Sequence, residues 1–206
     1  MTIRRCEDWG QAGIAPSFLP VFASDAALCR FLNDASRDRR SVPVVGLTGG
    51  DLWRTVGGSA DRPAPEPGAP GLLLPVDLGT VLVDDVEVFF AAHVIARRGW
   101  WRGELVAAMN AQYIGRWDVA PRSHPNDGRL DVVRVDPAMS IGDRWRAERR
   151  LPTGTHVPHP HIEQHRLPQV HIDLERPLDL TVDGTSAGRH RRLELKIVPD
   201  GLIVVI

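Results

Sequence analysis

The sequence predicts an α+β protein, in which a β-sandwich follows a small α/β segment at the N-terminus. From residue 72 to the C-terminus, strand-like runs recur at short intervals with tight turns between them, which is typical of a sandwich. Before residue 57 the chain offers one helix, one short apolar strand and a glycine-rich turn. Glycine, proline and small polar residues fill the stretch between these parts, which favours a flexible linker. We therefore expect an N-terminal segment 1–57, a linker or loop 58–71 and a sandwich 72–206.

The composition is that of a globular protein. Apolar residues make up 43% of the chain and charged residues 25%, which excludes disordered and fibrous classes. The net charge of −1 gives no reason to expect nucleic acid as a partner. The stretch MTIRRCEDWGQ lacks a long apolar core before a small-residue cleavage site, and no run approaches about 20 apolar residues, so we expect the protein to be neither exported nor integral to a membrane. Cys6 and Cys29 lack metal or redox spacing, so a reducing, cytoplasmic location is expected.

The N-terminal elements begin with an amphipathic helix at residues 24–40. Ser24 is a good N-cap for this helix, and apolar residues recur at helical spacing along it. These residues are Leu28, Phe31, Leu32 and Ala35. The apolar run 42–47 predicts a short buried strand, and a glycine-rich turn leads from it into a short helix at 52–56.

The sandwich strands follow in order along the chain. The expected strands cover residues 72–83, 86–98, 104–111, 113–120 and 130–136, then the tail segments QVHIDL, LDLTVD, RLELKIV and LIVVI. A short helix is expected at residues 140–150, with Ile141 and Trp145 facing inward.

Three turns carry aspartates, and their order along the chain is informative. Asp51 follows Gly49 and Gly50, Asp127 lies in APRSHPNDGRLDV at 120–132, and Asp183 ends the strand in LDLTVDGT. These segments resemble the C-terminal half of the diacylglycerol kinase family of lipid kinases, including its bacterial members. The resemblance covers about residues 42–206. Because the family has a full nucleotide-binding domain before the glycine-rich turn, it also implies that residues 1–57 are a truncated remnant of that domain.

The resemblance implies ATP-dependent phosphorylation of a lipid hydroxyl, with magnesium and ATP as cofactors. In this interpretation Asp183 takes the proton from the hydroxyl. The resemblance also implies that Asp127 is a magnesium ligand, and its carboxylate supplies the oxygen atoms that magnesium prefers. Gly49, Gly50 and Asp51 lie near the phosphates, where glycines allow a close approach.

The chain also departs from the family pattern. Thr185 stands where the family has a glutamate, Leu52 where it has a glycine, and His124 where relatives can offer a second carboxylate. Each Asp-Gly pair is equally well explained as a plain turn. The alternative function is therefore a catalytically inactive module, derived from a lipid kinase, that binds a lipid or a partner protein. A homodimer or a second subunit that completes the site, and a soluble nucleotide acceptor, also stay open.

One segment is suited to a membrane surface. Residues 97–102 combine Trp100 and Trp101 with arginines that include Arg102, which predicts contact with a lipid surface and a peripheral position at the membrane. Packing of the tryptophans in the core, with cation–π partners, is the alternative.

Histidines crowd the C-terminal third of the chain. A continuous strand would place His159, His161 and His165 on one face, where they could bind a metal ion. Prolines in this region disfavour a regular strand, so solvated or hydrogen-bonded histidines are the alternative.

Overall fold

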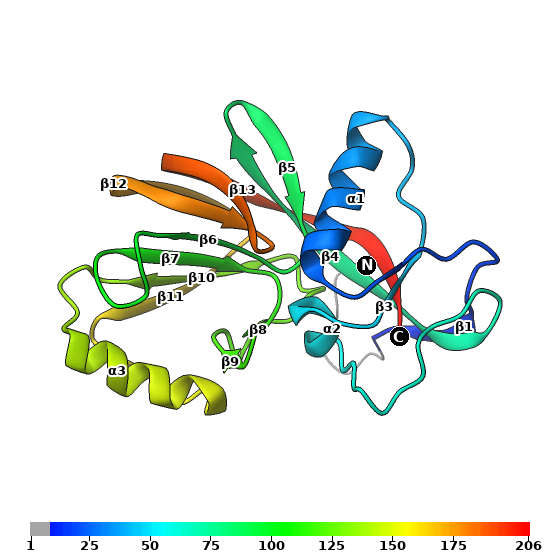
Figure 1. Ribbon diagram of the computed structural model, residues 1–206, viewed down its shortest axis with the longest axis horizontal. Coiled ribbons are helices and arrows are strands. Elements are labelled where there is room, and N and C mark those ends of the chain that lie inside the picture. The colour runs from blue at the N-terminus through cyan, green and yellow to red at the C-terminus, as the bar shows by residue number, and fades with distance from the viewer. Residues whose placement is uncertain (1–8) are drawn as a thin grey trace.

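The computed structural model describes residues 9–206, so Cys6 lies outside the described residues. The molecule is α+β, as predicted, and is built on one large sheet whose strands run in the order β1-β4-β13-β12-β6-β7-β10-β11 (Figure 1). These strands are β1 (Gln11–Ile14), β4 (Pro70–Val83), β13 (Thr185–Val205), β12 (Gln169–Val182), β6 (His93–Arg97), β7 (Leu105–Met109), β10 (Leu130–Val135) and β11 (Ile162–Leu167). Three further strands join it, β2 (Val21–Phe22), β3 (Val45–Leu47) and β5 (Val86–Phe90).

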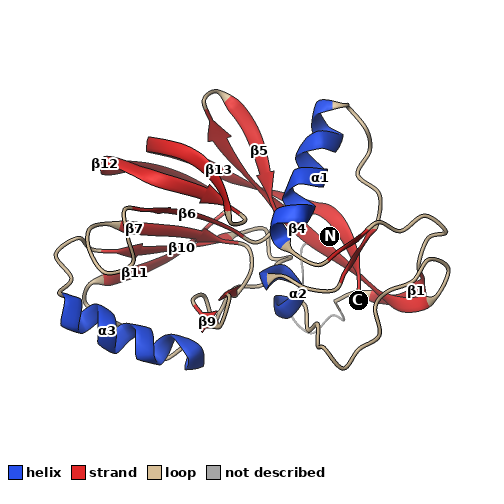
Figure 2. Ribbon diagram, in the orientation of Figure 1, coloured by secondary structure: helices blue, strands red, loops and turns tan. Residues whose placement is uncertain are grey.

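The helices are α1 (Asp25–Arg37), α2 (Asp51–Thr55) and α3 (Ile141–Arg150), and a 3-10 turn, η1 (Leu151–Thr153), continues α3. In Figure 2, α1 lies beside β4 and β5, and α3 lies at the other end of the molecule, next to β10 and β11. The Ser24 side chain accepts the backbone N–H of Ala27, which confirms the predicted N-cap of α1. A separate two-stranded hairpin, β8 (Tyr113–Ile114) and β9 (Trp117–Asp118), lies beside α2 and η1.

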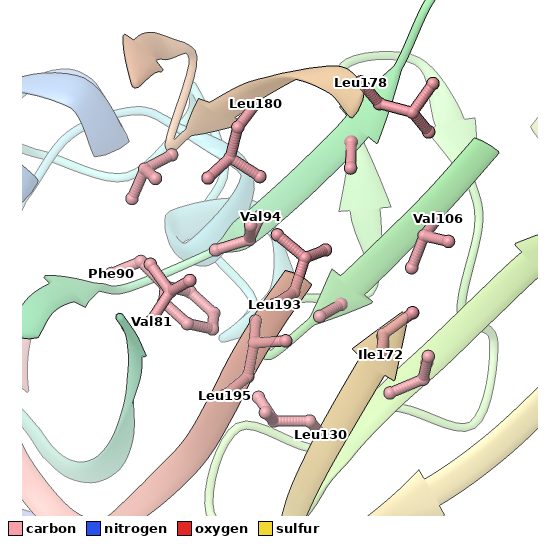
Figure 3. Packing of buried hydrophobic residues seen from close by; sticks show 14 of the residues in the cluster. Val81, Phe90, Val94, Val106, Leu130, Ile172, Leu178, Leu180, Leu193 and Leu195 are labelled. Atoms are coloured by element: carbon pink, nitrogen blue, oxygen red, sulfur yellow. The ribbon is translucent and has the colours of Figure 1, made fainter. Parts of the chain in front are cut away.

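The sheet folds over on itself and encloses the main core. Strand β12 pairs with β13 on one side and with β6 on the other, and its register shifts between Asp173 and Leu178. The layer of β12 and β13 therefore faces the layer of β6, β7 and β10. Figure 3 shows apolar side chains from both layers, among them Leu180, Leu193 and Val106, directed into the space between them.

Alternation along the strands produces a second core on the outer face. Val94 and Ala96 belong to the main core, whereas Ile95 between them points to the opposite side. Leu105, Ala107 and Met109 of β7 share that outer face. The β8–β9 hairpin and the segment after α3 cover it, through residues that include Trp117 and Leu151.

Several expected elements differ from those observed. The expected strand 86–98 is interrupted between β5 and β6, and the expected strand 113–120 is the short β8–β9 hairpin. The four tail segments form only two long strands, β12 and β13. The predicted inward orientation of Ile141 and Trp145 is wrong, because their exposed fractions are 49% and 52%. The buried face of α3 carries Arg144 and Ala147 instead.

Strand β4 begins at Pro70, within the segment expected to be a linker. Among residues 9–206, no helix has both the length and the apolar character needed to cross a lipid bilayer.

Candidate functional site

Asp183 lies in the two-residue turn that joins β12 to β13. Val182 pairs with Thr185 across this hairpin, and Asp183 and Gly184 both have positive φ, 45° and 80°. Two successive residues of positive φ match the right-handed twist of a hairpin, which explains the Asp-Gly sequence locally. The turn is not solvated, however, because only 3% of Asp183 is exposed.

The Asp183 carboxylate is bound by the backbone between β5 and β6. It accepts the N–H of Ala91 at 2.7 Å, of Ala92 at 3.0 Å and of His93 at 2.8 Å. These three donors would otherwise belong to a strand ladder. The carboxylate therefore accounts for the interruption of the strand that the sequence predicts over residues 86–98.

Asp51 meets the same cluster through the His93 side chain. The Nε2 atom of His93 lies 3.0 Å from an Asp51 carboxylate oxygen, and the other oxygen accepts the N–H of Gly115 at 2.8 Å. His93 is therefore the residue that connects Asp51 to Asp183. A lone histidine within the apolar run FFAAHVIA was the signal that could have identified it.

The turn at Gly49 and Gly50 is closed by the carboxylate of Asp25, the first residue of α1. This carboxylate accepts the N–H of Asp51 at 2.5 Å and of Leu52 at 3.2 Å. Gly50 has a φ of 100°, and a Cβ atom there would lie 2.5 Å from the Asp25 carboxylate. A Cβ at Gly49 would lie 2.5 Å from the Ala23 carbonyl oxygen. Glycine is thus required at both positions, by the close approach of Ala23 before α1 and of Asp25 at its first residue.

Burial and mutual charge shift the ionisation of this cluster. Burial raises the pKa of Asp183 to about 6, although the nearby His93 and the backbone donors oppose the rise. Burial also raises the pKa of Asp25. For His93, burial lowers the pKa, but the hydrogen bond to Asp51 and the surrounding carboxylates outweigh it and leave the pKa raised. Asp183, Asp25 and His93 therefore hold their protons more tightly than isolated side chains would.

Asp127 belongs to a second network. Its carboxylate pairs with the Arg166 guanidinium and accepts the N–H of Arg129 at 3.0 Å. Arg166 also lies 3.5 Å from Asp131. Burial raises the pKa of Asp127, and it raises that of Asp131 to about 6, with Arg166 opposing both shifts. Asp77, fully buried in β4, accepts the N–H of Gly128 at 2.7 Å and so fixes the 126–128 turn to the sheet.

The two networks meet at Asn110, which the sequence did not single out. Its side-chain amide donates to the carbonyl of Asp77 at 2.8 Å and to that of Ala91 at 2.9 Å. The Ala91 N–H in turn donates to Asp183. The structure therefore brings Asp51 and Asp183 together around His93 and places Asp127 in a neighbouring network across Asn110.

Neither network, as arranged, fits magnesium or a nucleotide phosphate. In the described part of the chain, no three His, Cys, Asp or Glu side chains are grouped to hold a metal ion. At Asp127 the positive charge is supplied by Arg166. At the glycine-rich turn the N–H donors that a phosphate would need already bind Asp25.

A third feature is an apolar cavity of about 100 Å³ on the outer face of the sheet. It lies between the strands β7 and β10 and the helix α3. Trp100, Trp101 and Trp117 line it, and the rings of Trp100 and Trp117 meet edge to face with centroids 5.1 Å apart. Arg97 lies over the Trp100 ring at 4.2 Å. The exposed fraction of Trp101 is 46%, and Arg102 beside it is exposed.

The predicted histidine group is not assembled by one strand. His165 lies in β11, whereas His159 and His161 precede it, with ring centroids 5.9 Å apart. His161 contacts Asp136 at 3.4 Å, and His165 lies 3.8 Å from Glu163. These three side chains thus have separate carboxylate or ring partners.

Comparison with known proteins agrees with this architecture. The family model described as the YegS C-terminal NAD kinase beta sandwich-like domain matches residues 83–206. Three solved structures from Bacillus anthracis strain Sterne are also similar. They are described as diacylglycerol kinases, two of them provisionally. Two superpose with a TM-score of 0.64 at 14% identity, covering 91% of this chain and 77% or 75% of theirs. The third has a TM-score of 0.65 at 13% identity, covering 91% of this chain and 77% of its own.

No curated protein matches the chain. At these identities the solved structures establish the fold alone. In fold, they confirm the predicted resemblance to diacylglycerol-kinase-like proteins. The family model covers more than half of the sequence. The chain belongs to the family of YegS C-terminal NAD kinase β-sandwich-like domains.

Proposed function

We propose that this protein binds a lipid at a membrane surface and holds an apolar part of that lipid in the cavity beneath α3. The cavity supports this proposal most directly, because its lining is almost entirely apolar and includes three tryptophans. Concave apolar sites with few polar groups are the usual form of small-molecule sites.

The surface around the cavity has the chemistry of a membrane interface. Ile141 and Trp145 lie one helical turn apart on the exposed side of α3, and Arg149 lies over the Trp145 ring at 4.8 Å. Arg144 donates to the carbonyls of Trp100, at 3.2 Å, and Gly103, so the turn that carries Trp101 lies against α3. Exposed tryptophans beside arginines suit the headgroup region of an anionic bilayer.

Binding to vesicles tests this proposal. We expect the protein to sediment with vesicles of phosphatidylglycerol and phosphatidylcholine, and Trp101→Ser with Trp145→Ser to reduce the partition coefficient by about tenfold or more. Phe18→Ser is the matched control, because Phe18 is exposed but lies before β2, away from α3. Equal binding of the wild type and the double variant would exclude this surface.

Phosphoryl transfer is a second candidate, favoured by the carboxylates gathered around His93. An aspartate whose pKa is raised to about 6 is suited to exchange a proton near neutral pH. In this candidate Asp183 takes the proton of a lipid hydroxyl after releasing a backbone donor, and His93 orients Asp51. Magnesium and ATP stay predictions of the family resemblance.

Calorimetric titration of magnesium–ATP separates the two candidates. Lipid binding alone predicts no nucleotide binding at millimolar ATP, and vesicle binding that is equal for the wild type and Asp183→Asn. Phosphoryl transfer predicts nucleotide binding and a phosphorylated lipid product that disappears in Asp183→Asn. A homodimer or second subunit that completes the phosphate site predicts nucleotide binding only above the concentration at which sedimentation shows assembly.

A further inference from the structure

The β8–β9 hairpin forms one wall of the apolar cavity and is separate from the large sheet. Ile114 and Trp117, on its two strands, line the cavity, whereas β8 and β9 pair with each other in a sheet of their own. The opposite wall comes from β7 and β10, each of which pairs with two strands of the large sheet. Because a hairpin that stands alone is only marginally stable, its position depends on the contacts that its turn and side chains make.

The turn of this hairpin is bound to α2. The Gly115 N–H donates to Asp51 at 2.8 Å, and Arg54 donates to the Gly115 carbonyl at 2.6 Å. The Arg54 guanidinium also lies over the Tyr113 ring, 3.9 Å from its centroid. The other carboxylate oxygen of Asp51 lies 3.0 Å from His93 Nε2. One turn therefore connects a wall of the cavity to the Asp51–His93 pair.

The third wall, α3, is held more firmly than the hairpin. Arg144 of α3 is almost fully buried and donates to the carbonyls of Trp100 at 3.2 Å and Asp136 at 3.1 Å. The hairpin contacts α3 through an ion pair of Arg116 with Glu148, in which the Arg116 side chain is 75% exposed, so this pair adds little stability. If the cavity widens, the hairpin is therefore the wall whose displacement costs least.

The cavity as it stands is too small for a long apolar group. Its volume is about 100 Å³, below the roughly 150 Å³ of a cavity that holds benzene. Sites for larger ligands usually reach roughly 300 Å³ or more. An apolar group of more than a few carbons must therefore displace a wall. Displacement of Ile114 and Trp117 also moves Gly115, which lies between them in the hairpin.

We propose that the β8–β9 hairpin is a lid that couples the cavity to the Asp51–His93 pair. Entry of an apolar group larger than the closed cavity moves the hairpin outward, breaks the hydrogen bond from Gly115 to Asp51 and frees one Asp51 oxygen for another donor. This inference rests on the proposed function, since it requires that the cavity take an apolar part of a lipid. It adds a regulatory link from that cavity to a carboxylate outside its lining.

Two apolar probes of different size test the lid. Xenon fits within the closed cavity, whereas butylbenzene is larger than benzene and exceeds it. Hydrogen exchange of the Gly115 amide is measured by NMR in the wild type with each probe. We expect butylbenzene to accelerate this exchange by about fivefold or more, because the amide loses its acceptor, and xenon to leave it unchanged. The amide of Ala108, in the middle of the sheet, should keep its rate with both probes.

A variant outside the cavity tests the coupling in the opposite direction. Contacts that hold the hairpin closed oppose the entry of large groups, because coupling between two sites is reciprocal. Arg54→Ala should therefore bind butylbenzene about fivefold more tightly by calorimetry, since one hydrogen bond and one cation–π contact no longer hold the closed hairpin. Its affinity for xenon, measured by xenon NMR, should not change. Arg37→Ala, which removes an exposed pair with Asp34 on α1, is the matched control and should change neither affinity.

The outcomes separate this inference from the proposed function. Unchanged Gly115 exchange with butylbenzene bound, or an equal or weaker affinity of Arg54→Ala for butylbenzene, would overturn the lid and leave the apolar cavity in place. Binding of xenon without binding of butylbenzene to either protein would show that the hairpin does not open, with the same consequence. If neither probe binds the wild type, the proposed apolar site fails, and the lid fails with it.

Discussion

Asp183 and His93 are joined by two reciprocal hydrogen bonds across the fold, one to a side chain and one between backbones. The His93 N–H donates to the Asp183 carboxylate at 2.8 Å, and the Asp183 N–H donates to the His93 carbonyl at 2.9 Å. The pair fixes the β12–β13 turn to the start of β6, and the His93 ring then reaches Asp51. One carboxylate therefore orders both the hairpin turn and the strand that faces it.

The buried carboxyl of Asp183 should make stability depend on pH. Its pKa is raised to about 6 in the folded protein from 3.8, so the folded state keeps a proton that the unfolded state loses. The free energy of unfolding should therefore fall as the pH rises from 4 to 6, and this group should account for about 3 kcal/mol of the fall. The raised pKa of His93 acts in the same direction at higher pH.

Asp183→Asn should remove this contribution, which urea denaturation at pH 4, 5, 6 and 7 would measure. The variant should lose about 3 kcal/mol of pH dependence, and some dependence should remain because Asp131 has a similar pKa. An unchanged profile would mean that Asp183 does not retain its proton. Asp179→Asn, in an exposed position on the same strand, is the control.

Asp25→Ala should destabilise the protein by about 1 kcal/mol, because the N–H groups of Asp51 and Leu52 lose their carboxylate acceptor. Asp34→Ala, on the exposed side of α1, should change the free energy of unfolding by less than about 0.5 kcal/mol. Chemical denaturation of the two variants at pH 7 makes the comparison. Equal effects would show that the cap on the glycine-rich turn contributes nothing.

Arg144→Met should destabilise the protein by about 3 kcal/mol, because its guanidinium binds several backbone carbonyls and is almost fully buried. Tryptophan fluorescence should report the loosening of the turn at Trp100 before global unfolding. Arg146→Met, two positions along α3, removes only an exposed pair with Asp143 and should cost less than about 0.5 kcal/mol. Similar costs for both variants would contradict the anchoring role of Arg144.

Arg166→Ala should leave Asp127 and Asp131 without their shared cation. Since Arg166 lowers both pKa values, its loss should raise them further and destabilise the folded protein by about 1 to 2 kcal/mol at pH 8. The cost should shrink at pH 5, where Asp131, whose pKa is raised to about 6, is largely protonated. Denaturation at the two pH values measures this cost. Arg192→Ala, which removes an exposed ion pair with Asp173, is the control and should show no dependence on pH. An equal cost of Arg166→Ala at pH 5 and pH 8 would contradict this role of Arg166.

The sequence by itself determined the features that depend on a few neighbouring residues. The cap at Ser24 and the helix that follows it, the recurrence of short apolar strands and the Asp-Gly turn at Asp183 were all predictable from local propensity and periodicity. The order of the aspartate turns also identified the diacylglycerol-kinase-like fold.

Only the tertiary structure decided which residues the aspartates meet. Asp183 binds backbone donors some ninety positions away, and Asp25 closes a turn that follows it by twenty-six residues. In α3, Arg144 points inward and Trp145 points outward, because backbone carbonyls beside the cavity supply acceptors for the Arg144 guanidinium. Hydrophobic periodicity records which residues avoid water, whereas the partner of a buried polar group depends on which strands the sheet places side by side.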